Sequence, residues 1–187
     1  MPEETRLIGV VNGAVFLLIL FLLARMEKNY NWHKQTFSYF GCKKTRASKV
    51  FNTSVLLYSI FQSVFLWQIS TLYQSPGAFI ALVLLFSTIP AGILCSYFTG
   101  TKSSLIHNLM VGIIIFNSCL GGLIWCWVVL SFHPLIGIMQ SLLTIGVIAI
   151  LIRGVIKRKY FPANYEAVFF GGIFLWNCLN TLPLLTR

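Results

Sequence analysis

The chain has 187 residues, of which 57% are hydrophobic and 10% are charged, and it contains four glutamates and no aspartate. Because soluble domains carry about 25% charged residues, this composition excludes an ordinary soluble domain and indicates a protein that works in or at a bilayer. The scarcity of carboxylates also excludes most proton pumps, metal cages and paired-carboxylate mechanisms.

Six apolar stretches are each long enough to cross a bilayer, which takes about 20 mostly apolar residues in a helix. In chain order they are Leu7–Ala24, Val50–Tyr73, Ala78–Phe98, Leu105–Leu130, Pro134–Ile152 and Ala163–Leu184. Helices are expected because every backbone polar group must be satisfied inside the hydrocarbon. The first stretch follows an acidic segment and precedes no small-x-small cleavage site, so we interpret it as a mature helix and not a signal peptide. The sequence therefore predicts one all-α membrane domain, residues 1–187, as a polytopic bundle of six transmembrane helices.

The basic residues are divided unevenly between the two faces of this predicted bundle. Seven lie in the first connection, residues 25–49, and five more lie in the third and fifth connections. This face carries the whole net charge of +10, while the charges near the two termini cancel on the other face. The positive-inside rule predicts that the basic face is cytoplasmic, which gives an N-out/C-out arrangement. In a bacterial host such a multi-pass protein is expected in the plasma (inner) membrane.

The basic face also indicates partners. Basic residues near anionic headgroups contribute about 1 kcal/mol each to membrane binding, so we expect anionic lipids at this face. A membrane-protein partner or a homo-oligomer stays open. We expect no nucleic-acid partner, because the basic residues are scattered over loops and form no recognisable nucleic-acid module.

Metal and cofactor motifs are absent from the sequence. Of its three histidines, His107 and His133 are separated by a whole predicted span, and no H-x-x-x-H or C-x-x-C string occurs. We therefore expect neither a metal nor a cofactor.

Small and amide-bearing residues interrupt the apolar spans. Gly9 and Gly13 form a G-x-x-x-G string, which predicts a close approach between helices. Gln62, Asn117 and Asn177 fall in mid-membrane. These amides could line a path for a solute, or they could hydrogen bond between helices.

A set of polar residues from distant parts of the chain is placed at the basic face by topology alone. This predicted inner-face cluster comprises Ser38, Gly41, Asn52, His107, Asn108 and Glu166. We expect a hydrogen-bonded structural cluster that anchors the first connection over the bundle. The catalytic alternative assigns Ser38 as nucleophile, His107 as base and Glu166 as the group that orients the base.

Several of these residues lie in strings that resemble domain-of-unknown-function family 998. The similar strings are Thr36-Phe37-Ser38-Tyr39-Phe40-Gly41 after the first helix, Phe51-Asn52 opening the second and His107 opening the fourth. The Glu-Arg pair that starts the family's sixth helix reads Glu166-Ala167 here, and Trp176 matches a position further along. The resemblance implies a six-helix membrane fold. Family 998 is itself distantly similar to the DRAM- and Frag-like group of membrane proteins, some of whose members are tied to lipid or GPI-anchor handling.

Three classes of function stay open on this sequence. We favour a membrane module, without catalytic activity, that binds lipid or a partner protein. Its support is the basic face and the aromatic residues of the first connection, which suit a loop lying on lipid headgroups. A small-solute permease is the alternative. An interfacial lipid hydrolase or transferase that uses Ser38, His107 and Glu166 is the second alternative.

Overall fold

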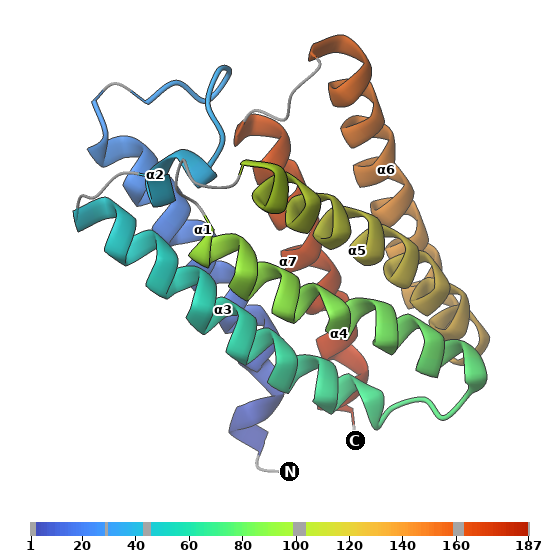
Figure 1. Ribbon diagram of the computed structural model, residues 1–187. Coiled ribbons are helices and arrows are strands. Elements are labelled where there is room, and N and C mark those ends of the chain that lie inside the picture. Colours follow the sequence, from blue (N-terminus) through green and yellow to red (C-terminus); the bar gives the residue numbers. More distant parts are fainter. Residues whose placement is uncertain (1–2, 29, 43–45, 99–103, 159–162, 187) are drawn as a thin grey trace.

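The computed structural model describes residues 3–28, 30–42, 46–98, 104–158 and 163–186 (Figure 1). These residues form six long α-helices, a short α-helix and an initial 3-10 helix, with no strand among them. The long helices are α1 (Ile8–Met26), α3 (Arg46–Ser70), α4 (Pro76–Tyr97), α5 (Ser104–Phe132), α6 (Pro134–Arg158) and α7 (Ala163–Leu185). The short elements are η1 (Glu3–Leu7) and α2 (Ser38–Cys42).

All six long helices are long and apolar enough to cross a membrane, which confirms the predicted all-α bundle. Helices α3 and α6 extend furthest beyond their predicted spans: α3 begins at Arg46 and α6 ends at Arg158. Both extensions are rich in polar and basic residues, so a hydropathy criterion leaves them out of the predicted spans. The helices nevertheless continue through them. The predicted first connection is also partly helical, because it contains α2.

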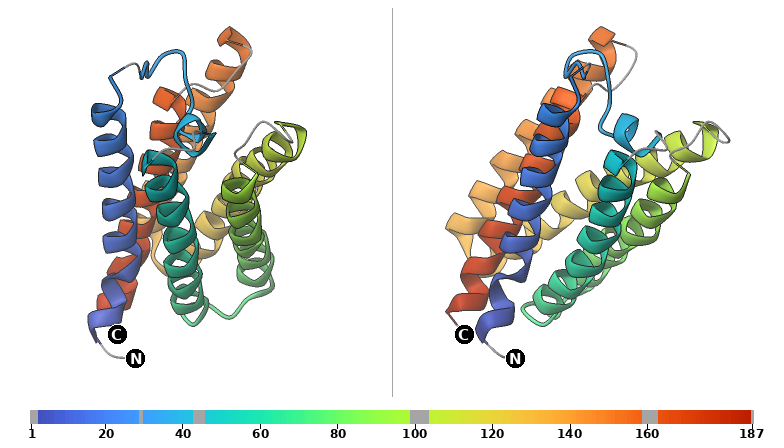
Figure 2. Two further views of the ribbon diagram at one scale, coloured as in Figure 1. Left: turned by 60° about the vertical axis from the view of Figure 1, so that its left-hand side comes forward. Right: turned by 90° about the vertical axis from the view of Figure 1, so that its left-hand side faces the viewer.

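The six long helices form a ring in which each helix packs on its neighbour (Figure 2). The order around the ring is α1, α3, α4, α5, α6 and α7, and α7 closes the ring against α1. The two termini lie together at one end of the bundle, and α2 lies at the opposite end (Figure 1). We call this opposite end the basic end, because the first connection and its exposed Lys28 and Lys34 lie there.

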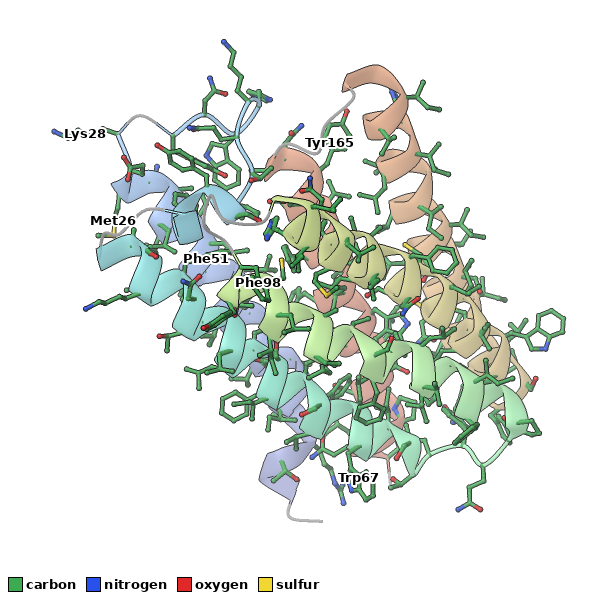
Figure 3. The ribbon with its side chains drawn as sticks, in the orientation of Figure 1. Met26, Lys28, Phe51, Trp67, Phe98 and Tyr165 are labelled. Carbon is green, nitrogen blue, oxygen red and sulfur yellow. The ribbon has the colours of Figure 1, made fainter. Side chains whose placement is uncertain are left out.

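The outer surface of the ring is strongly apolar. Trp67, Phe79 and Trp127 are 67%, 70% and 74% exposed, and the side chains of Met26 and Trp67 point away from the bundle (Figure 3). Such a surface is untenable in water but is the expected contact surface with lipid chains. The protein is therefore a multi-pass integral membrane protein.

The G-x-x-x-G string packs inside the chain. A Cβ atom added at Gly9 would overlap the ring of Phe65 on α3, and one added at Gly13 would lie 2.9 Å from Phe174 on α7. The two glycines therefore allow α1 to fit closely between α3 and α7, which is the close approach that their spacing predicts.

The mid-membrane amides hydrogen bond between helices. Gln62 and Asn177 exchange hydrogen bonds of 3.0 and 3.2 Å between α3 and α7, and the Asn177 amide also donates to the carbonyl of Gly9. Asn117 on α5 donates to the Ser87 hydroxyl on α4 at 2.7 Å. These contacts link neighbouring helices of the ring and use much of the hydrogen-bonding capacity that a solute path would need.

The orientation of the bundle gives a first testable prediction. We expect a cysteine-labelling reagent that does not cross membranes to reach a Gln74→Cys variant from outside intact cells, because residue 74 lies at the end opposite the basic end. Cys42, whose side chain lies outside the described residues, should react only after the cells are opened. Labelling of Cys42 in intact cells would reverse the orientation.

Candidate functional site

A cavity of about 180 Å³ lies in the centre of the ring and is partly open to the outside. Since a water molecule needs roughly 10–15 Å³ of such space, the cavity has room for on the order of ten waters or for one apolar chain segment. It runs between Ser38 at the basic end and Trp176 in α7, and side chains of every long helix line it. Its wall is mostly apolar.

Aliphatic and aromatic side chains dominate this wall. The half of the cavity nearer the basic end is lined by the aromatic residues Phe16, Phe51, Tyr58 and Phe170. The rings of Phe16 and Tyr58 stack with their centroids 4.4 Å apart. Two of the hydroxyl groups on the wall donate to carbonyls of their own helix, that of Thr88 to Leu85 and that of Ser96 to Ile93. The wall that the cavity presents along its length is therefore mostly apolar.

A hydroxyl, a thiol and a carboxylate group lie together where the cavity meets the basic end. Ser38, Cys95 and Glu166 line the cavity there and are partly buried. They come from three elements: Ser38 begins α2, Cys95 lies in the last turn of α4, and Glu166 lies in the first turn of α7. The ends of these helices meet at one level, which brings together residues far apart in the sequence.

His107, one turn into α5, joins two of these groups. Its Nε2 atom lies 3.0 Å from the Ser38 hydroxyl. Its Nδ1 atom lies 3.3 Å from the Cys95 sulfur and 3.4 Å from the Cys95 carbonyl oxygen. If the Nδ1–H group donates to that carbonyl, Nε2 keeps its lone pair and accepts the Ser38 O–H proton. The structure thus brings Ser38 and His107 together.

Glu166 has a different neighbour from the one the catalytic alternative requires. Its carboxylate accepts a hydrogen bond of 2.5 Å from the backbone N–H of Phe37, the residue before Ser38. Both ring nitrogens of His107 face Ser38 and Cys95, so Glu166 does not orient the imidazole and that part of the prediction is wrong. It fixes the backbone beside Ser38 instead.

The other predicted cluster residues lie apart from this pair. The carbonyl of Gly41 accepts a hydrogen bond from the Ser48 hydroxyl, which ties α2 to α3. The Oδ1 atom of Asn52 is buried and has no hydrogen-bond partner among the described residues. Asn108 is exposed. These three residues share the basic end but not the contacts of Ser38 and His107.

The first connection packs on the bundle, as the expected anchoring cluster predicts, and two of its aromatic side chains are buried there instead of lying on lipid headgroups. Phe37 and Phe40 are 3% and 1% exposed, and the rings of Tyr30 and Phe40 lie 4.5 Å apart. Backbone hydrogen bonds join the segment to the start of α7, from Ala163 to Gln35 at 2.7 Å. Burial raises the pKa of the Tyr30 phenol above its usual range, and the nearby Glu166 carboxylate raises it further. The aromatic residues thus form a cover over the cavity's basic end.

Sequence reasoning missed Cys95 as a site residue. It lies in an apolar span, where a cysteine is most often a small packing residue. Its only signal is its place twelve residues before His107, at the other side of the connection between α4 and α5. No motif encodes that pairing.

Comparison of the chain with protein-family models, with curated proteins and with solved structures finds no match. The resemblance to family 998 therefore stays a prediction, and function is argued from the site.

Proposed function

We propose that the protein binds one membrane lipid, with an acyl chain in the central cavity and the polar part of the lipid at the basic end. The observation that carries this proposal is the polarity of the cavity. Most of its wall is apolar, while Ser38, Cys95 and Glu166 lie at one end, at the level where the helices end. A membrane lipid has the same distribution of polarity, with a long apolar chain and a polar group at one end.

Filling such a cavity with hydrocarbon is physically favourable. An empty cavity loses the dispersion contacts of its wall. Each water molecule needs two to four polar partners, and a mostly apolar wall supplies few of them. The surrounding bilayer supplies acyl chains at high concentration. Exposed basic residues of the basic end, including Lys34 and Lys49, then face the lipid phosphates.

A permease for polar solutes has weaker support. Gln62 lines the cavity, but its amide is paired with Asn177. Asn117 is paired with Ser87. The polar path that such a permease needs is therefore interrupted by interhelical hydrogen bonds, and a lipid site accounts better for the apolar wall.

A cavity-filling substitution tests the proposal. Ser118 lines the cavity from α5, whereas Leu120 on the same helix is 37% exposed on the outer surface. We expect Ser118→Trp to remove the lipid that stays with the protein through extensive detergent exchange, because the indole occupies the space of the acyl chain. Leu120→Trp should leave that lipid in place.

Mass spectrometry of the purified proteins measures the bound lipid. About one lipid per chain in the wild type and in Leu120→Trp, with a loss of most of it in Ser118→Trp, is the expected result. Equal lipid content in all three proteins, or none in the wild type, would contradict the proposal.

A further inference from the structure

We propose that Ser38 is a nucleophile and His107 its general base, and that the pair cleaves an acyl ester of the bound lipid. This inference rests on the proposed lipid site. It adds an activity, hydrolysis of a carboxylic ester, and it assigns the reacting atoms. Four observations support it.

The first observation is the contact itself. The Ser38 hydroxyl and the His107 Nε2 atom are 3.0 Å apart, within the range in which a base can take a proton from a nucleophile. Ser38 also lines the cavity, so its oxygen can reach a group inside it. His107 stands behind Ser38 and is not among the residues that line the cavity.

The second observation concerns the tautomer of His107. A general base must present a lone pair to the hydroxyl, so the proton must sit on the other ring nitrogen. The Cys95 carbonyl oxygen, 3.4 Å from Nδ1, can only accept a hydrogen bond, so it favours the tautomer with the proton on Nδ1. A backbone carbonyl thereby takes the orienting role that a carboxylate has in the familiar triad.

The third observation is depth. Ser38 lies at the level of the helix ends, and the cavity continues from it towards Trp176 among apolar side chains. In a glycerolipid the ester carbonyl lies at the boundary between the hydrocarbon chain and the headgroup. An acyl chain that fills the cavity therefore places its ester carbonyl beside Ser38.

The fourth observation separates Ser38 from the competing nucleophile, Cys95. The Cys95 thiol also faces His107, but it lies in the last turn of α4. The negative end of the helix dipole disfavours a thiolate there, whereas low-pKa cysteines are found at helix N-termini. The serine is therefore the better candidate.

The reaction follows from these positions. The Ser38 hydroxyl gives its proton to His107 Nε2 as its oxygen bonds to the acyl carbonyl carbon. The ester C–O bond breaks, and the leaving alcohol takes the proton from His107. A water molecule then loses a proton to His107, attacks the acyl-serine and releases the fatty acid, and the proton returns to the Ser38 oxygen.

A long-chain alkyl fluorophosphonate tests the assignment on the full chain in detergent or in lipid nanodiscs. This probe forms a bond from phosphorus to an activated serine oxygen and releases fluoride. We expect mass spectrometry to find the probe on Ser38 of the wild type. His107→Ala should slow the labelling at least about 100-fold, because a general base contributes about 10²–10⁴-fold to a rate. Ser63→Ala, on α3 and outside the cavity wall, should label like the wild type.

Because the probe is mapped directly on Ser38 of the wild type, the test does not depend on whether a variant at Ser38 folds. No probe on Ser38 in wild-type protein that retains its lipid would overturn the catalytic inference and leave the lipid site standing. Equal labelling rates in the wild type and a folded His107→Ala, or a probe found on Cys95 instead, would also overturn it. Labelling of Ser38 in protein that retains no lipid would support the serine and contradict the proposed lipid site.

Discussion

Gly137→Ala is expected to destabilise the bundle by about 1–3 kcal/mol, the usual cost of overpacking a tight contact. Gly137 lies in the first turn of α6, directly after the connection from α5. A Cβ atom there would lie 2.5 Å from the Cα and 2.6 Å from the backbone nitrogen of Leu130. A backbone cannot turn aside as a flexible side chain can, so the whole hairpin of α5 and α6 must shift.

Gly146 on the same helix is the matched control, because a Cβ atom added there meets nothing within 4 Å. Alanine should be neutral or stabilising at that position, since glycine in a helix interior costs about 0.8–1.0 kcal/mol relative to alanine. Thermal unfolding in detergent measures both variants. Equal Tm values for the two would show that α5 and α6 are not in close contact at Gly137.

Glu166→Leu should detach the first connection from the bundle, with a loss of about 1–3 kcal/mol for the buried N–H of Phe37 left without an acceptor. Glu166→Gln should retain most of the stability, because the amide oxygen can still accept this hydrogen bond. Limited proteolysis at the exposed Lys34 reports the detachment directly. We expect faster cleavage of the leucine variant and near wild-type cleavage of the glutamine variant.

The same two variants test whether Glu166 positions Ser38 in addition to stabilising the fold. Because Phe37 precedes Ser38, Glu166→Leu should also lower fluorophosphonate labelling of Ser38, and Glu166→Gln should restore it. If Glu166→Gln behaved like Glu166→Leu in both measurements, the charge of Glu166 and not its hydrogen bond to Phe37 would be what matters.

The sequence predicts those features of the fold that follow from the requirements of the bilayer's hydrocarbon core. The six spans can be predicted because each is a long apolar run. The polar cluster can be predicted because topology alone places Ser38, His107 and Glu166 at one face. The contact at Gly9 and Gly13 could be predicted because small residues one helical turn apart let helices approach closely.

The remaining features depend on packing, which no local pattern encodes. The helix α2 is five residues long, too short for a hydrophobic period. The pairing of Cys95 with His107 depends on how α4 and α5 meet. The aromatic residues of the first connection suit both a membrane surface and a buried cover, and the fold selects the cover because Phe37 and Phe40 fill space above α1 and α7. The cavity exists only when the ring has closed.

The central claim, that an acyl chain occupies the cavity, is tested most directly with a phospholipid that carries a photoreactive diazirine near the methyl end of one chain. Ile173 and Trp176 line the cavity, whereas Leu142 and Leu175 are 68% and 50% exposed on the outer surface. We predict cross-links at Ile173 and Trp176 in addition to the outer positions that surrounding lipid reaches, and we predict their loss in Ser118→Trp. Cross-links confined to outer positions such as Leu142 and Leu175 in the wild type would contradict the account.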